Sequence, residues 1–448
     1  MRTLLLVLML AMSSVLFAQG LFENAVSDTD NSDERSSLLW SGYGRGSVFG
    51  GSRDFDFATV FGEFCLQGNI RANKLMFHTD LRFRSGLQFG NEYTRTEIKE
   101  AYAGYSGERT DILFGQQIVA WGRTDGFNPT NNITPDDYFF LSSEPDDQKL
   151  SNFMMRIRYR PFSFLDLDLI AIPYYKPSIY RYDLFNLGDN ATFDEMILPD
   201  RTLRNSTLAV RTNFEFSEIG FSLSWFRGYD PYYGFDLENV DWSRGFPVID
   251  YIPSAYLKNS LGADLAIPLG KWIVRGEMAY NLTKDFEDKI YIPNPDLTYV
   301  FGIEGTFVKV HAILQYIGKY TQDFTSLEEP MLTEPGNPLA QLAYANDMIA
   351  YESALFNRKI FLQQEKTNHA FSLTLSRSFA YEALNAEFTV YYNTVSEDYM
   401  LRPKITWKVT DALAAAVGLS YMDGPEGSLF DYTNPVMTGG FLEMKVSF

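Results

Sequence analysis

Hydrophobic and polar residues alternate along most of this chain from Leu38 onward. In the segment 75–85, leucines and phenylalanines occupy one face of an extended strand, and the other face carries charged side chains that include Arg82 and Arg84. Successive side chains of a strand point to opposite sides, so this pattern predicts one apolar and one charged face. The same period of two recurs in the segments 58–70, 165–171, 208–216, 257–267, 272–280 and 401–409.

The charged faces decide which side of such strands meets lipid. An Arg or Lys that faces lipid at the middle of a bilayer costs roughly 2–4 kcal/mol, so the charged face must line an interior. Beyond the N-terminal segment, no stretch has about 18 uninterrupted apolar residues, the length that a transmembrane helix needs. Only a closed sheet then satisfies every backbone hydrogen bond in lipid. The predicted fold is all-β: a transmembrane, antiparallel, up-and-down β-barrel.

The connections between the predicted strands alternate between short and long. Short ones are expected near 72–73, 106–109, 161–163, 217–218, 268–270, 380–382 and 410–411. Long ones are expected at 123–150, 175–202, 228–254, 283–296, 320–367 and 423–439. Outer-membrane barrels have short periplasmic turns and long external loops. The spacing predicts about 18 strands, with 16 as the alternative, and an even number places both chain ends in the periplasm.

The N-terminus predicts export from the cytoplasm. Arg2 precedes an apolar run, Leu4–Phe17, and the small residues Ala18 and Gly20 suit a cleavage site, so residues 1–20 are predicted to be a signal peptide. Residues 21–37 are polar and predict a flexible periplasmic leader, and residues 38–448 form the predicted barrel. The single cysteine, Cys65, is remote from the cleavage site, which argues against a lipoprotein and excludes an internal disulfide.

Composition agrees with a barrel and excludes one class of partner. Aromatic residues make up 16% of the chain, yet the mean hydropathy is −0.17, because large apolar residues are interleaved with polar ones. The formal net charge is −19. A protein this acidic is expected to bind nucleic acid poorly, since phosphate binding depends on clustered Lys and Arg.

One block of motifs carries a family resemblance. It comprises Glu100-Ala101-Tyr102, Gly115-Gln116-Gln117, Trp121-Gly122, Asp125 and Asn128-Pro129. This block resembles a group of uncharacterised bacterial outer-membrane barrels, some of them encoded beside inner-membrane exporters of hydrophobic molecules, and it is similar in pattern to alginate-export and substrate-specific porins. The resemblance implies a barrel of this size with a transport role. It also implies that the last strand, Gly440–Phe448, is recognised by the barrel-assembly machinery through its terminal phenylalanine.

The first long loop follows this block, and two expectations concern it. Trp121 is expected to end a strand over 112–121 and to join the aromatic belt at the outer leaflet. The loop 123–150 is expected to fold into the pore and narrow it, with a loop lying outside over the rim as the alternative. Its acidic residues make the candidate constriction, namely Asp125, Asp136, Asp137 and Glu144.

Charged residues on the inward faces are the candidate pore lining. They are Arg82, Arg84, Arg156, Arg158, Arg211, Arg275, Glu277, Arg402 and Lys404. Rings of charged side chains set ion preference in pores, so a basic wall that faces an acidic constriction predicts orientation of a polar or anionic solute. The alternative is that these residues form structural ion-pair ladders in a polar interior.

Chemistry beyond transport finds little support in the residues. There are three histidines, without zinc-ligand spacing, and no serine-hydrolase elbow, so no catalysis, metal or cofactor is expected. The segment 338–356 has helical spacing and predicts a short helix, either over the mouth or on the surface.

The predicted function is a porin-like channel for passage or export of a small polar or anionic solute. The alternatives are a conduit for hydrophobic cargo that works with a periplasmic or inner-membrane exporter, and a structural or adhesive barrel in the outer-membrane lipid.

Overall fold

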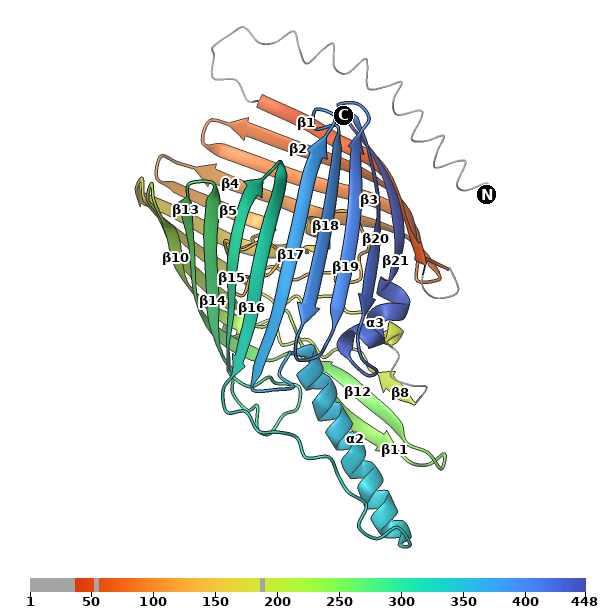
Figure 1. The fold of residues 1–448 in the computed structure, drawn as a ribbon. Helices are drawn as coiled ribbons and strands as arrows, with labels where there is room; N and C mark the ends of the chain where they lie inside the picture. The colour runs from red at the N-terminus through yellow and green to blue at the C-terminus, as the bar shows by residue number, and fades with distance from the viewer. Residues whose placement is uncertain (1–36, 52–55, 186–189) are drawn as a thin grey trace.

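The computed structural model describes residues 37–51, 56–185 and 190–448, so the predicted signal peptide and all but the last residue of the predicted leader lie outside the described residues. The described part forms an 18-stranded antiparallel barrel, which confirms the predicted fold class and strand number (Figure 1). The barrel strands are β1 (Ser37–Gly51), β2 (Phe57–Ala72), β3 (Leu75–Gln88), β4 (Asn91–Ser106), β5 (Thr110–Gln117), β6 (Asn152–Phe162), β7 (Leu165–Ile172), β9 (Thr207–Glu215), β10 (Gly220–Tyr229), β13 (Leu257–Leu269), β14 (Trp272–Leu282), β15 (Asp296–Phe307), β16 (Val310–Thr321), β17 (Thr367–Phe379), β18 (Leu384–Asn393), β19 (Tyr399–Lys408), β20 (Leu413–Asp423) and β21 (Gly439–Ser447).

The last strand closes the ring by pairing with the first. β21 pairs antiparallel with β1 from Tyr43 to Gly51. The pairing extends to the terminal residue, because Gly42 and Phe448 exchange backbone hydrogen bonds of 3.0 and 2.9 Å. The Phe448 ring stacks on Phe64. A Cβ atom on Gly42 would lie 2.7 Å from that ring, so the glycine makes room for the closing aromatic.

The outer face of the barrel is apolar all the way round. Every barrel strand exposes at least one large hydrophobic side chain, for example Trp40, Phe64, Phe83, Ile98, Phe114, Met155, Leu169, Leu208, Leu223, Leu261, Met278, Phe301, Leu314, Phe371, Phe388, Ile405, Val417 and Leu442. A soluble protein rarely exposes so large a continuous apolar surface. Because backbone groups in a closed barrel bond within the sheet, this surface suits lipid. The protein is therefore an outer-membrane barrel.

The two ends of the barrel differ in their connections. One end carries tight turns and also the C-terminus, and the other carries the long loops, a short three-stranded sheet and a projecting helix (Figure 1). By the usual arrangement of outer-membrane barrels, the first is the periplasmic end and the second the extracellular end. In the part of the chain that the structure describes, no helix is long and apolar enough to span a membrane.

The extracellular loops build a cap with an aromatic core. Its elements are β8 (Ala191–Phe193), β11 (Gly234–Asp241), β12 (Val248–Ser254), α2 (Pro338–Ile360) and α3 (Leu429–Met437), with 3-10 turns at Pro145–Gln148, Tyr182–Leu184 and Leu203–Asn205. The core packs Tyr233, Phe235, Tyr251, Tyr256, Phe356 and Phe361 together.

The helix expected over 338–356 is present and extends to Ile360. Its inner half is buried against the aromatic core through Phe356 and Ile360. Its outer half projects away from the barrel (Figure 1), and Leu339 is 77% exposed. One helix thus combines both expected arrangements, because it packs over the mouth at one end and remains a surface helix at the other.

Candidate pore and its constriction loop

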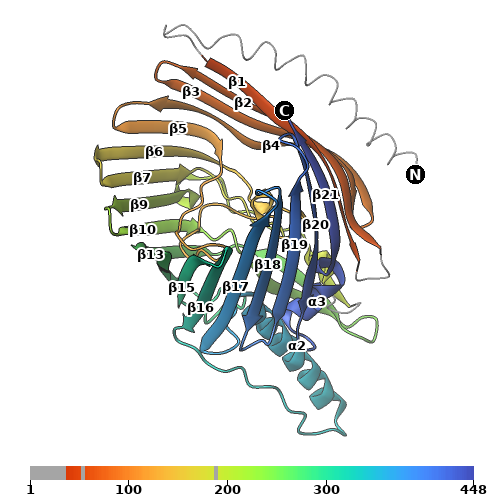
Figure 2. The ribbon, with the colours of Figure 1, turned by 45° about the horizontal axis from the view of Figure 1, so that its top comes forward.

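The connection between β5 and β6, residues 118–151, lies within the ring of strands (Figure 2) and is called the constriction loop below. Its first half bonds to strands β9, β13 and β14, and its second half bonds to β1, β3, β4, β19 and β21. These strands lie on different sides of the barrel in the order of the sheet. The loop therefore crosses the lumen.

Glu277 on β14 anchors the first half of the loop. Its Oε2 atom accepts hydrogen bonds from the backbone N–H groups of Arg123 and Thr124 and from the Thr124 hydroxyl, at 3.0, 3.3 and 2.8 Å. Its Oε1 atom accepts from the N–H and hydroxyl of Thr130, at 2.9 and 2.8 Å. The residue is 3% exposed. A buried carboxylate is stable only when such donors replace water.

Gly122, the second residue of the Trp-Gly motif, lies directly against the Glu277 carboxylate. Its φ angle is +110°, in the region that favours glycine. A Cβ atom at this position would lie 2.6 Å from Oε2 of Glu277. The glycine thus lets the loop backbone close over the carboxylate.

The Arg123 side chain bonds the loop to wall residues near the periplasmic end of the barrel. Its guanidinium donates to Asp264 at 2.7 Å and to Glu215, the last residue of β9, at 2.6 Å. β9 runs from the loop end to the turn end, so Arg123 lies near the periplasmic rim. Its backbone carbonyl also accepts from Arg275 at 2.6 Å.

Asp147 anchors the second half of the loop to the opposite side of the barrel. It accepts from Arg45 of β1 at 2.5 Å, from Arg82 of β3 at 2.8 Å and from Ser142 of the loop at 2.6 Å. Burial alone would raise the pKa of this carboxyl, but Arg45 and the hydrogen bonds outweigh burial and hold the pKa of Asp147 below its usual range. Lys99 adds a hydrogen bond to the Asp147 carbonyl at 2.7 Å.

Trp121 corrects one expectation from the sequence. β5 ends at Gln117 instead of continuing to residue 121. Trp121 is 2% exposed and packs inside the barrel with Val119, Ile133, Met154, Ile170 and Phe226. Its indole N–H donates to Asp168 at 3.3 Å. The residue holds the root of the constriction loop and takes no part in a lipid-facing belt.

Most of the arginines proposed to line the pore are joined to carboxylates. Arg84 pairs with Glu63 and Glu97, and its guanidinium lies 4.1 Å from the centre of the Phe140 ring in the loop. Arg82 pairs with Asp80 as well as Asp147. The remaining pairs are Arg156–Asp168, Arg158–Asp166, Arg211–Asp264 and Arg275–Glu304. This part of the wall is a network of ion pairs.

One of the pore-lining candidates, Arg402, differs from this pattern. Arg402 on β19 forms no ion pair with a described residue, and its guanidinium donates to the Ser142 carbonyl at 2.8 Å. Lys404, two residues further on the same face, lies 3.5 Å from Glu387. Lys404 therefore keeps a carboxylate partner, whereas Arg402 has none among the described residues.

The four acidic loop candidates do not gather at one place. Asp125 has a half-exposed side chain 4.0 Å from Arg275, and Glu144 is exposed. The backbone of Asp136 forms an isolated β-bridge with Lys149, and the backbone of Asp137 forms one with Ile179 in the next loop. Burial raises the pKa of Asp136 to about 6 and also raises the pKa of Asp137. The four acids therefore form no single acidic ring.

Sequence reasoning missed three residues that hold the loop. Arg45 occupies an inward position on β1, between Tyr43 and Ser47, so the period of two contained the signal for it. Arg123 follows directly after the Trp-Gly motif. Asp147 was one of several acids in the loop, and nothing in its local sequence distinguishes it.

One side of the lumen has fewer polar contacts with the loop. Among the described residues, no hydrogen bond or ion pair joins the constriction loop to β16, β17 or β18. The loop contacts this side through the Phe127 ring, which stacks on Tyr391 of β18. The inward side chains there include Gln315, Ser372, Thr374 and Thr389. This stretch of wall is mostly polar, and its charged residues, Lys319 and Glu387, are paired with Asp296 and Lys404.

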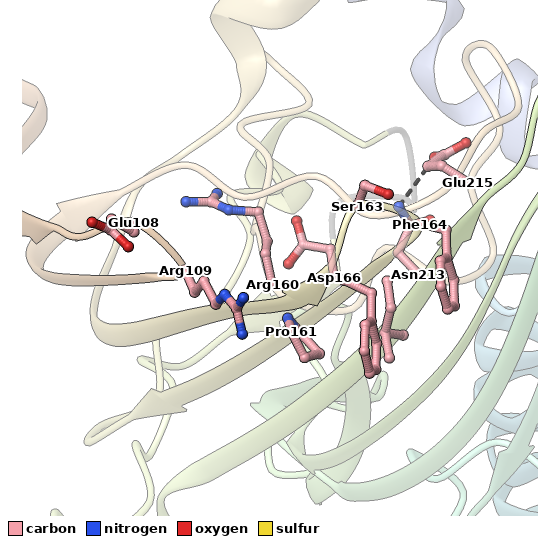
Figure 3. A pocket seen from close by; sticks show the side chains of 11 residues that line it. Glu108, Arg109, Arg160, Pro161, Ser163, Phe164, Asp166, Asn213 and Glu215 are labelled. Carbon is pink, nitrogen blue, oxygen red and sulfur yellow. Dashed lines mark hydrogen bonds between the residues drawn. The ribbon is translucent and has the colours of Figure 1, made fainter.

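The periplasmic rim holds a cavity of about 460 Å³ (Figure 3). Arg109, Arg160, Asp166 and Glu215 line it, from the turns β4–β5 and β6–β7 and the end of β9. Arg160 pairs with Asp111 and Glu215 pairs with Arg123, so the cavity adjoins the deepest point of the constriction loop. Among the described residues, no group of three or more His, Cys, Asp or Glu side chains is arranged to hold a metal ion.

A closed 18-stranded barrel with an apolar outer face, a charged lumen and an inward-folded loop has the architecture of an outer-membrane porin. Among solved structures, Pseudomonas aeruginosa OpdK with vanillate aligns at a TM-score of 0.53 and 8% identity, over 92% of this chain and 98% of that chain. Acinetobacter baumannii OccAB2 aligns at 0.51 and 10%, over 94% and 99%. Pseudomonas aeruginosa OccK2 (OpdF) in complex with glucuronate aligns at 0.51 and 11%, over 92% and 97%. At these identities the likeness concerns the fold. No family model and no curated protein matches the sequence.

Proposed function

We propose that this protein is a channel for small polar or anionic solutes and performs no chemistry. The observation that carries the proposal is the constriction loop, which is fixed at Glu277 and at Asp147 across the lumen of a closed barrel. A loop fixed to opposite walls narrows the lumen, and porin-type barrels of this strand number are wide enough to hold a channel. The solute path that we propose follows the polar wall of β16–β18, beside the loop.

The anionic part of the proposal rests on β19. Arg402, Lys404 and Lys408 occupy inward positions along this strand, next to the proposed path. Lys404 is paired with Glu387, but Arg402 and Lys408 form no ion pair with a described residue. Such unpaired cations leave a positive potential in the lumen, whereas the charges of the paired arginines of β3 and β6 are largely cancelled by their carboxylates. Two of the structural neighbours were solved with vanillate and glucuronate, which are carboxylates. The same solute class suits this row of cations.

The test is ion selectivity in planar bilayers under a salt gradient. We expect the wild-type protein to conduct and to prefer anions. The double variant Arg402→Gln/Lys404→Gln should lower the anion-to-cation permeability ratio several-fold, because it removes two lumen cations. The matched control is Arg244→Gln, which removes an exposed cation between β11 and β12.

Three outcomes would contradict the proposal. A purified barrel that never conducts ions is not a channel. A cation-selective wild type, or a double variant with an unchanged permeability ratio, would refute the anionic preference. Liposome swelling complements this test, since a channel should admit small sugars or acids.

The other two functions gain no support from the geometry. A conduit for hydrophobic cargo needs an apolar path or a lateral opening, and here the lumen is charged and adjacent strands pair around the whole ring. A structural or adhesive role does not require a loop fixed across the lumen. Recognition of β21 by the barrel-assembly machinery, and cooperation with an exporter, stay predictions.

A further inference from the structure

A small cavity lies at the extracellular end of the lumen, apart from the constriction. Its volume is about 220 Å³, and wall residues of β13–β16 and the end of α2 line it. We call it the vestibule cavity. One of its residues, Lys258, donates to Asn132 of the constriction loop at 2.7 Å. The cavity therefore adjoins the entrance to the narrow part of the channel.

The charges that line the vestibule cavity cancel. Lys258 forms an ion pair with Asp230. Lys319 lies 3.8 Å from Asp296. A ligand with a net charge would have to compete with one of these pairs, and a buried charge without a partner is costly. The lining therefore suits an uncharged ligand.

The cavity is also lined by neutral polar groups, among them the Asn281 amide. The Asn281 side chain donates through Nδ2 to Asp296 at 2.9 Å, which fixes the orientation of the amide. Its Oδ1 atom is then left buried without a partner. The lining also includes the hydroxyl groups of Tyr232, Tyr256 and Thr283, so it offers both donors and acceptors and suits ligand groups that do both. Hydroxyl groups qualify, because each one both donates and accepts.

Aromatic rings complete the lining. Tyr256 and Phe361 meet edge to face, with ring centres 5.8 Å apart, and Tyr232 packs on Phe361 at 6.1 Å. Such rings offer apolar faces beside the polar groups, the combination typical of sites for small organic ligands. The volume is smaller than the roughly 300–1,000 Å³ of sites for drug-sized molecules. The cavity thus suits a single compact molecule.

We propose that the vestibule cavity binds one small uncharged polyhydroxy molecule, of the size of a monosaccharide, before it reaches the constriction. Its role in uptake rests on the proposed channel function, but the binding itself does not. The site is distinct from the cation row of β19, and the two predict different preferences: a neutral solute at the vestibule and anions at the constriction.

The experiment compares three sugars that have the same pyranose ring and differ in the charge of one substituent. Glucose, glucuronate and glucosamine are titrated into the purified full-length protein in detergent, and saturation-transfer NMR measures their affinities. We expect glucose to bind about tenfold more tightly than either charged analogue, the ratio that one uncompensated charge or lost hydrogen bond produces. Asn281→Ala should weaken glucose binding by a similar factor.

A second variant keeps the test decisive if Asn281→Ala fails to fold. Lys319→Met leaves Asp296 without its lysine, so the cavity becomes net negative and glucosamine should replace glucose as the preferred ligand. Lys284→Met is the matched control, because Lys284 is exposed on the β14–β15 loop outside the cavity. It should leave all three affinities unchanged.

The proposal is overturned if none of the three sugars binds, if glucuronate binds as tightly as glucose, or if both cavity variants keep the wild-type affinity for glucose. Conductance is measured separately. A protein that conducts but does not bind glucose loses only the vestibule proposal. A protein that binds glucose but never conducts loses only the channel proposal.

Discussion

The two anchors of the constriction loop reverse the roles of loop and barrel. At Glu277 the barrel supplies the carboxylate and the loop supplies neutral N–H and O–H donors. At Asp147 the loop supplies the carboxylate and the barrel supplies the guanidinium groups of Arg45 and Arg82. The first anchor depends on one residue. The second is shared, since Arg45 also contacts Glu63 at 2.8 Å and Glu443 at 3.7 Å.

This difference predicts which anchor is more sensitive to mutation. Without Glu277, several buried donors of the loop lose their acceptor at once. Without Asp147, the two arginines keep other carboxylates, among them Asp80 at 3.1 Å from Arg82. A single-residue anchor therefore fails as a unit, whereas a network loses one link at a time.

Glu277→Ala should have the largest effect. Loss of a charged acceptor for buried donors should destabilise the loop by about 3 kcal/mol, release its first half and raise single-channel conductance with added current noise. Conductance and limited proteolysis within 118–151 measure this. Glu218→Ala, an exposed acid in the β9–β10 turn, is the control. Unchanged conductance would show that Glu277 does not hold the loop.

Gly122→Ala tests the same anchor from the loop side. The new Cβ would meet the Glu277 carboxylate, and φ is unfavourable for alanine, so we expect a loss of about 2–3 kcal/mol in urea unfolding. Gly126→Ala is the matched control: φ there is +82°, but no atom lies within 4 Å of its Cβ position. It should cost about 1 kcal/mol through backbone strain alone. Equal costs for the two variants would disprove the contact with Glu277.

Asp147→Asn should cost less than either change at the first anchor, about 1–2 kcal/mol, because the amide still accepts one hydrogen bond and the arginines keep other partners. Conductance should rise less than in Glu277→Ala. A comparison of the two variants under the same conditions decides whether the network compensates. A larger effect for Asp147→Asn would reverse our ranking of the anchors.

A change of pH should have the smallest effect, and it should act in opposite directions on two carboxyl groups of the constriction loop, Asp136 and Asp147. Burial raises the pKa of Asp136 from 3.8 to about 6, so ionised Asp136 destabilises the fold above that pH, and stability rises as pH falls from 7 toward 4. The pKa of Asp147 is held below its ordinary 3.8, so its contribution is present above pH 3.8 and is lost below it. Urea unfolding across this range should pass through a maximum, with a rising limb on the order of 1 kcal/mol. Asp136→Asn should reduce the rising limb, to which Asp137 also contributes, without changing the loss of stability below pH 3.8. A rising limb unchanged from the wild type would disprove the assignment.

The sequence predicted the barrel well because its signal is local. Period-two alternation fixed the inward faces, for example those with Arg82 and Arg211, and both lie in the interior. The long connections also fell where the structure has its extracellular loops. Trp121 was misplaced because alternation was extended past Gln117, where β5 ends and the chain turns into the lumen.

The anchors of the loop were beyond sequence reasoning. Thr130 and Glu277 are separated by 147 positions, and Ser143 and Glu443 by 300. Nothing in the local sequence marks such partners, because each donor and acceptor finds the other only after the ring has closed. The same holds for the vestibule cavity, whose lining comes from β13–β16 and the distant helix α2.

By itself the sequence determined the membrane-spanning sheet, since the side chain of every second residue must match either lipid or a wet interior, and that choice depends on neighbours along one strand. The tertiary structure alone decided how the lumen is occupied. Charges there are stable only when burial is offset by partners, and those partners lie on opposite walls of the barrel.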